Sequence, residues 1–92
     1  MRIIWSELAK DYYLLIIEQL FEKWNLSIVE KFETETVELI SKIAHHNHIC
    51  PKSKIENFHK CVVNKHISLI YRIENKNLEI ITVLFNQSDH LF

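Results

Sequence analysis

The chain has 92 residues, 48% of them hydrophobic, and a formal net charge of −1 at pH 7. This length predicts one domain, residues 1–92, with a single core. The near-neutral charge argues against general electrostatic binding to nucleic acid, and no apolar run reaches the roughly 18 residues of a membrane span. Because no secretory signal pattern precedes the first charged residues, we expect a cytoplasmic protein that does not enter the membrane.

The first third of the chain predicts a short strand followed by a helix. Residues 2–5 alternate as a strand does, and Ser6 is a suitable N-cap for a helix over residues 7–23. Apolar residues recur there every three or four positions. The resulting apolar stripe is broad enough to be buried on two sides.

A second helix is predicted after the break at Asn25-Leu26. Ser27 followed by Glu30 has the spacing of a capping box, and apolar residues then mark one face as far as Ile43. Two helices with so short a connection form an antiparallel hairpin. Its apolar side is expected to cover a sheet.

From residue 57 onward the apolar residues alternate, which predicts three strands at about 58–63, 66–74 and 77–85. Asn64-Lys65 and Asn75-Lys76 separate them, and asparagine suits tight turns in a chain that has no glycine. The fold class is therefore α+β, with the order β-α-α-β-β-β and the helical hairpin on one face of a small antiparallel sheet.

Two-residue turns at both dipeptides fix a predicted register. Cys61 then lies opposite Ser68, and Arg72 lies opposite Glu79. The helices are expected to cover the face that carries Phe58, Val62, Ile67, Leu69, Tyr71 and Ile73. The other face receives His59, Cys61, Val63, His66, Ser68, Ile70, Arg72, Glu79, Ile81, Val83 and Phe85.

His45, His46, His48 and Cys50 are the densest group of potential metal ligands. Their spacing matches no common zinc pattern, so an exposed loop with chance histidines is the better interpretation, and we expect neither a metal nor a cofactor. Cys50 and Cys61 suit reduced thiols in the cytoplasm, and a bridge between them is the less favoured alternative.

The string VVNKHISLIYRI, together with IIWSELAKDYYLLI and Trp24 upstream, resembles the RelE/ParE superfamily of bacterial toxin–antitoxin toxins, with the ParE-like branch closer. The resemblance implies a growth-inhibiting toxin that an antitoxin neutralises. It leaves open a homodimer or a toxin–antitoxin hetero-oligomer. ParE-like members act on DNA gyrase, whereas RelE-like members cleave mRNA on the ribosome.

The ribonuclease activity is the alternative here. The resemblance aligns the family's C-terminal arginine with Ser88, and no Arg or Lys follows Lys76. A metal-free ribonuclease needs groups that move protons and stabilise charge on the phosphate. His59, Lys60, His66 and Arg72 are the candidates, although no family motif assigns them these roles. A third alternative is a non-toxic domain that only binds its antitoxin.

The expected antitoxin-binding surface is the strip of apolar residues on the sheet face that the helices leave uncovered. Basic residues nearby would contact acidic residues of the antitoxin. The apolar strip comprises Ile70, Ile81, Val83 and Phe85, and the basic residues are Arg72, Lys60, Lys52 and Lys54.

Overall fold

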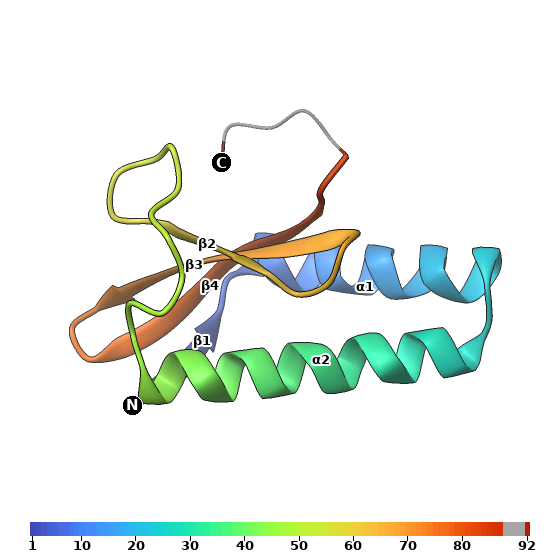
Figure 1. Cartoon of the computed structure of the whole chain (residues 1–92), viewed down its shortest axis with the longest axis horizontal. Coiled ribbons are helices and arrows are strands. Elements are labelled where there is room, and N and C mark those ends of the chain that lie inside the picture. The colour runs from blue at the N-terminus through green and yellow to red at the C-terminus, as the bar shows by residue number, and fades with distance from the viewer. Residues whose placement is uncertain (88–91) are drawn as a thin grey trace.

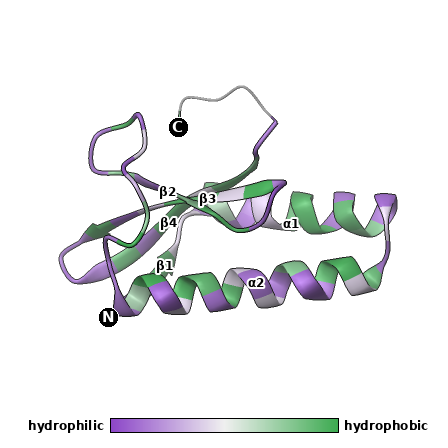
Figure 2. Cartoon of the chain, viewed as in Figure 1, coloured by the Kyte–Doolittle hydropathy of each residue, from purple (hydrophilic) through white to green (hydrophobic). Residues whose placement is uncertain are grey.

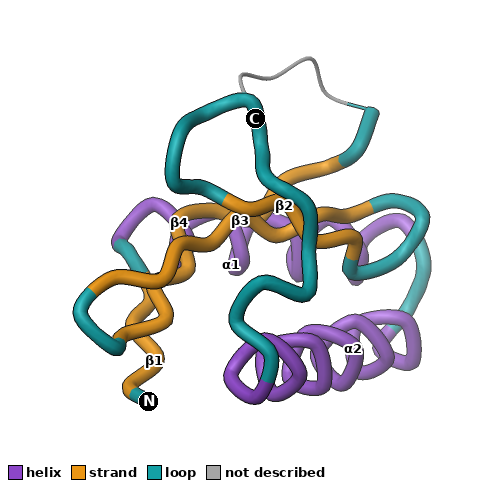
Figure 3. Tube along the Cα trace, turned by 60° about the vertical axis from the view of Figure 1, so that its left-hand side comes forward, coloured by secondary structure: helices purple, strands orange, loops and turns teal. Residues whose placement is uncertain are grey.

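Two helices pack on one side of a four-stranded sheet in the computed structural model, which describes residues 1–87 and 92 (Figure 1). The predicted α+β class and element order are confirmed. In Figure 3 the loop that precedes β2 rises on the side of the sheet away from the helices. The elements are β1 (Arg2–Trp5), α1 (Glu7–Lys23), α2 (Leu26–His45), β2 (His59–Val62), β3 (Ile67–Glu74) and β4 (Asn77–Phe85).

The sheet has the strand order β1-β4-β3-β2 and is mixed. β2, β3 and β4 form the predicted antiparallel meander. β1 departs from the expected all-antiparallel arrangement, because it runs parallel to β4, from the pair Arg2–Asn77 to the pair Trp5–Ile80. Two helices and two strands separate β1 from β4, a connection long enough to permit parallel pairing.

Both helices begin at side-chain caps. Ser6 is the N-cap of α1, as predicted, and its Oγ accepts a hydrogen bond from the Ala9 N–H at 3.0 Å. α2 begins after Asn25, whose side-chain oxygen accepts from the Ile28 N–H at 3.1 Å. The predicted cap Ser27 is wrong, since Asn25 provides an equally good acceptor two residues earlier. Within the described residues, neither helix has the length and apolar content of a membrane span.

The turn between β2 and β3 is wider than a two-residue hairpin. The side-chain oxygen of Asn64 accepts from the backbone N–H groups of His66 and Ile67, at 2.8 and 3.0 Å. The register consequently differs from the prediction by one residue, and Cys61 pairs with Leu69. Since side chains alternate along a strand, this shift exchanges the two faces of β2.

The predicted faces of β2 are therefore wrong. His59 and Cys61 face the helices and are buried, whereas Val62, which was expected beneath the helices, is exposed. Phe58 likewise lies outside the helix-covered layer, and its ring stacks on Phe92 at a centroid distance of 6.2 Å. The error follows from the turn, because one extra residue there reverses every side chain of the strand.

The turn between β3 and β4 is the two-residue hairpin that the sequence predicts. Asn75 and Lys76 have φ values of 51° and 63°, the positive values that such a turn requires. Arg72 lies opposite Glu79, as expected. The predicted register is correct at this end of the hairpin.

A β-bulge at Ile81 changes the register further along the same pair of strands. The shift falls between Ile70 and Tyr71 of β3, and Ile81 has no partner there. Its carbonyl oxygen instead accepts a hydrogen bond from Ser6 Oγ at 2.7 Å. Beyond the bulge the two faces of β4 are exchanged. Val83 therefore points toward the helices, whereas the predicted register placed it on the opposite face.

The core lies between the helices and one face of the sheet. Figure 2 shows that apolar and polar stretches alternate along both helices. Val83 is fully buried there, and the half-buried Phe85 packs against the same cluster. One cluster contains Ala9, Ile40, Ile43, Cys61, Leu69, Tyr71, Leu78 and Ile80, and the other contains Ile16, Leu20, Val29, Phe32, Ile67 and Val83.

Cys50 and Cys61 form a disulfide bond, with their Cα atoms 5.3 Å apart. The expectation of two reduced thiols is wrong for this structure. Compartment alone suggested free thiols, but the register shift turns Cys61 toward the helix-covered side, where the loop after α2 brings Cys50. The bond fastens that loop to β2.

Candidate functional site

The loop of residues 46–58 forms one wall of a polar cleft of about 630 Å³ at the beginning of β2. β3 provides the opposite wall. The cleft combines imidazole, basic and acidic groups, and this mixture is suited to binding a polar ligand. Its ionisable lining residues are His48, Lys52, Glu56, His59, Arg72 and Glu74.

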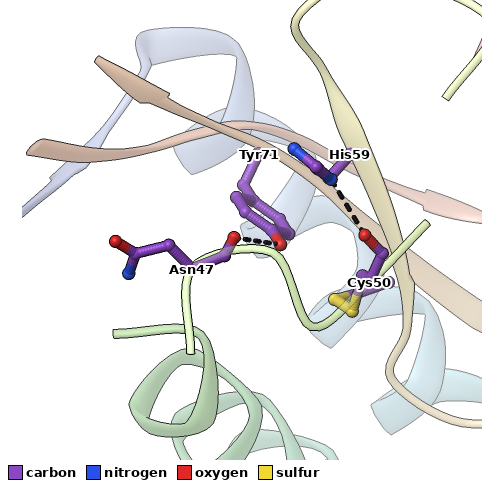
Figure 4. Close-up of a disulfide and its surroundings, with 5 residues drawn as sticks. Asn47, Cys50, His59 and Tyr71 are labelled. Carbon is purple, nitrogen blue, oxygen red and sulfur yellow. Dashed lines mark hydrogen bonds between the residues drawn. A yellow bond between two sulfur atoms is a disulfide. The ribbon is translucent and has the colours of Figure 1, made fainter. Parts of the chain in front are cut away.

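Aromatic and backbone contacts hold the loop against the sheet, as Figure 4 shows for Asn47, Cys50, His59 and Tyr71. The Tyr71 hydroxyl donates to the Asn47 carbonyl oxygen at 2.8 Å, and His59 Nδ1 donates to the Cys50 carbonyl oxygen at 2.9 Å. The His59 ring stacks on Tyr71, with centroids 5.0 Å apart. Because a carbonyl can only accept, Nδ1 carries the proton, and the lone pair of neutral His59 is on Nε2.

The Tyr71 phenol is fully buried in this arrangement. Burial raises the pKa of Tyr71 above its ordinary value of 10.0, and a backbone hydrogen bond from Cys50 opposes the rise. A neutral phenol therefore remains a hydrogen-bond donor throughout the physiological pH range. Its position below the loop gives Tyr71 a structural role in docking the loop.

Arg72 lines the cleft beside two carboxylates. Its Nε donates to Glu79 on β4 and lies 3.2 Å from a carboxylate oxygen of Glu74. The three side chains are partly exposed, so solvent screens the pairs and their contribution to stability is small. Their proximity nevertheless reduces the positive charge that Arg72 presents to a phosphate.

The four catalytic candidates from the sequence do not converge. His59 and Arg72 line the polar cleft, but Lys60 lies on the outer face of the sheet, opposite Ile70. His66 is at the other end of the sheet, with its ring 6.4 Å from that of Trp24. Ser88, the position aligned with the family's arginine, lies outside the described residues.

The histidine-rich loop does not form a metal centre in the part of the chain that the structure describes. No group of three His, Cys, Asp or Glu residues is arranged there to hold an ion. Cys50 is bonded to Cys61, and His45 Nδ1 donates to the Ser41 carbonyl oxygen at 2.8 Å. The disulfide removes the thiolate that a zinc site would use.

The predicted antitoxin-binding residues do not form one exposed strip. Ile70 and Val83 are fully buried, whereas Ile81 and Phe85 are partly exposed. The bulge separates them, since it turns Val83 and Phe85 toward the helices. Among the predicted basic contacts, Lys52 and Arg72 line the polar cleft, Lys54 is exposed on the same loop, and Lys60 is partly exposed on β2.

An apolar groove of about 320 Å³ runs between α1 and β4. α1 forms one wall, and three of its lining side chains are substantially exposed: Leu8 at 48%, Tyr12 at 45% and Leu15 at 43%. Leu84 and Phe85 contribute from β4, and Phe92 also lines the groove. Sequence reasoning missed the helical wall, although the breadth of the apolar stripe on α1 indicated more than one buried side.

The arrangement of a helical hairpin on a mixed four-stranded sheet defines an α+β fold, and several solved structures have a similar fold. No family model and no curated protein matches the chain. The chromosomal ParDE TA system from P. aeruginosa matches with a TM-score of 0.78 and 15% identity, over 92% of this chain and 95% of that one.

Two further structures are similar. The YoeB/ParE toxin from Agrobacterium tumefaciens has a TM-score of 0.69 and 14% identity, over 94% of this chain and 99% of that one. The YoeB–YefM complex from Staphylococcus aureus has a TM-score of 0.66 and 17% identity, over 94% and 97%. At these identities the match establishes the fold, and the RelE/ParE-type fold that the sequence predicts is confirmed.

Proposed function

We propose that this chain is the toxin component of a toxin–antitoxin module. The proposal is supported by the near-complete match to the fold of ParE and YoeB toxins. The observation that carries it is the exposed apolar groove between α1 and β4. A domain of this size rarely leaves so many large apolar side chains exposed unless a partner covers them.

The antitoxin is proposed to place an apolar segment in this groove. Leu8, Tyr12 and Leu15 have the i, i+4, i+7 spacing of a continuous helical edge, and Phe85 extends the surface onto β4. Burial of such a surface contributes about 25 cal/mol per Å², less the cost of ordering the partner. The predicted contacts of Lys52, Lys54, Lys60 and Arg72 with acidic residues of the antitoxin remain part of the proposal.

Neighbouring leucines of α1 provide a matched test. Leu15 lines the groove, whereas Leu14 is 65% exposed and lies outside the groove-lining set. Leu15→Asp should weaken binding of the antitoxin to this chain by about tenfold or more, and Leu14→Asp should change that affinity little. Isothermal titration calorimetry measures both affinities. Equal effects of the two substitutions would place the antitoxin elsewhere.

The target is proposed to be DNA gyrase, and the protein is proposed to act in the cytoplasm. The support is chemical, because the ribonuclease candidates His59, Lys60 and His66 are spread over the sheet and Arg72 is flanked by carboxylates. The resemblance to the ParE-like branch points in the same direction.

Three assays distinguish this target from the alternatives. Purified protein should inhibit supercoiling by gyrase and leave mRNA intact in a translation reaction. Cleavage of mRNA in the ribosomal A site, with supercoiling unaffected, would instead establish the RelE-like alternative. A chain that binds its antitoxin but leaves growth, supercoiling and mRNA unchanged would be the non-toxic domain.

A further inference from the structure

A short stretch of the chain covers the outer edge of β2. β2 is at the edge of the sheet, so one side of its backbone would otherwise face solvent. The Lys60 N–H donates to the Pro51 carbonyl oxygen at 3.0 Å, and the Ser53 N–H donates to the Phe58 carbonyl oxygen at 2.9 Å. An isolated β-bridge lies between these bonds. Residues 50–53, here named the cover segment, thus act as a short additional strand.

Besides its two bonds at the edge of β2, the cover segment is held at Cys50, whose backbone bonds His59 and Tyr71, while its middle has few attachments. Pro51 and Lys52 are exposed, and only Cys50 and Ser53 at its two ends are partly buried. Exposed backbone hydrogen bonds with little apolar burial open readily. The covalent bond from Cys50 to Cys61, which is 1% exposed and part of the core, is therefore the strongest attachment.

We propose that the Cys50–Cys61 bond is a redox-modification site, whose reduction by a dithiol frees the cover segment and opens the polar cleft. The two cysteines are close in sequence, with a separation of 11, but they belong to a loop and a strand that move separately once the bond is broken. The loop also provides His48, Lys52 and Glu56 to the cleft, so its release removes one wall. The proposal does not depend on the toxin function.

The chemistry is thiol–disulfide exchange. A thiolate of the dithiol attacks Sγ of Cys50, the more accessible sulfur, and the Cys50–Cys61 bond breaks as Cys61 leaves as a thiolate and takes up a proton. The second thiol of the reductant then attacks the mixed disulfide and releases Cys50. Two electrons and two protons pass from the dithiol to the protein, and the reductant becomes a cyclic disulfide.

Release of the cover segment changes what β2 presents to its surroundings. The backbone amide of Lys60 loses its acceptor, and the unpaired strand edge becomes accessible to solvent. The Cys50 carbonyl no longer holds the His59 ring, which gains freedom within the cleft. The reduced and oxidised proteins therefore differ at one edge of the sheet, while the two core clusters keep their contacts.

Hydrogen exchange of the whole chain, with and without dithiothreitol, tests the proposal. In the oxidised protein the amides of Ser53 and Lys60 should exchange slowly. After reduction their exchange should be about tenfold faster or more, whereas the amides of β3 and β4 keep their rates. Mass spectrometry after alkylation reports whether two thiols have been released.

Cys50→Ser provides the second variant, since Cys50 is only partly buried at the margin of the core and the substitution keeps Cys61 in place. Its Ser53 and Lys60 amides should exchange fast without reductant, and dithiothreitol should have no effect on them. Slow exchange in the reduced protein would overturn the proposal, as would failure of the bond to form with oxidised glutathione. An equal acceleration throughout β3 and β4 would also overturn it, because the bond would then stabilise the whole domain.

Discussion

Two hairpins in this sheet contain the same dipeptide and fold differently. Asn75-Lys76 forms a two-residue turn with two positive φ values, whereas Asn64-Lys65 belongs to a wider turn in which the Asn64 side chain accepts two backbone hydrogen bonds. Asparagine can therefore end a strand through its backbone conformation or through its side chain. Only the first way gives a two-residue hairpin, and only there is the register predictable from the dipeptide.

The largest expected loss of stability tests which face of the sheet the residues of β4 occupy around the bulge. Ile80 is fully buried against the helices, while its neighbour Ile81 is partly exposed at the bulge. Ile80→Ala should reduce the free energy of unfolding by about 2–5 kcal/mol, and Ile81→Ala by roughly 1 kcal/mol or less. Urea unfolding measures both. Similar losses would show that the bulge does not separate the two side chains.

The next effect tests the first hairpin, which places Tyr71 opposite His59 and beneath the loop. Tyr71→Phe removes the donor to the Asn47 carbonyl in a partly buried hydrogen bond and should cost about 1–3 kcal/mol. A retained free energy of unfolding would argue that the loop is not docked through this hydroxyl.

The same substitution should change the pH dependence of stability. Burial raises the pKa of Tyr71, so the folded protein holds the proton more tightly than the unfolded chain. The stabilisation is complete below the ordinary tyrosine pKa of about 10 and is lost as pH rises through the folded-state value. Unfolding midpoints above pH 10 should therefore fall less steeply for Tyr71→Phe. A residual dependence is expected from Tyr13, whose pKa is also raised by burial and by Glu33.

Substituting each asparagine by glycine separates its two ways of ending a strand. Asn64→Gly removes an acceptor of two backbone hydrogen bonds and should destabilise the protein by about 1 kcal/mol. Asn75→Gly keeps a residue that adopts positive φ, so the free energy of unfolding should change by less than about 0.5 kcal/mol. Thermal unfolding at one fixed pH compares the two variants. A larger loss for Asn75→Gly would contradict the assignment.

The smallest effect concerns the lysines of the same dipeptides. Lys76 has φ of 63°, which is unfavourable for a residue with a Cβ atom, whereas Lys65 does not have positive φ. Lys76→Gly should raise the free energy of unfolding by about 0.5–1 kcal/mol. Lys65→Gly should give no gain, because glycine there only adds freedom to the unfolded chain. Chemical denaturation with replicate measurements resolves the difference.

Local patterns predicted most of the fold. The bounds of α1, its cap Ser6 and the pairing of Arg72 with Glu79 follow from residues close in sequence or from one tight turn. The bulge was not predictable in this way. At the bulge the Ile81 carbonyl accepts a hydrogen bond from Ser6 Oγ, which comes from the other end of the chain, and no local pattern encodes that contact.

The candidate sites were less predictable because they depend on which face of the sheet each side chain occupies. One unforeseen residue in the first turn and one bulge in the second hairpin reassigned Cys61 and Val83. Free thiols were expected from the cytoplasmic compartment alone, and the compartment does not indicate that Cys50 lies beside β2. The wall of the apolar groove on α1 was partly visible in the sequence, as a stripe too broad for one buried face.

The parallel pairing of β1 with β4 constrains how the protein is made. During synthesis β1 emerges well before β4, its partner in the sheet, because both helices, β2 and β3 lie between them in the sequence. At about 5–20 residues per second the ribosome needs roughly 4–16 s to cover that interval. Until then the apolar faces of α1 and α2 have no complete sheet to cover, and pairing of such distant segments is slow in itself. The nascent chain therefore passes through a period in which chaperones or an early-bound partner can act on it.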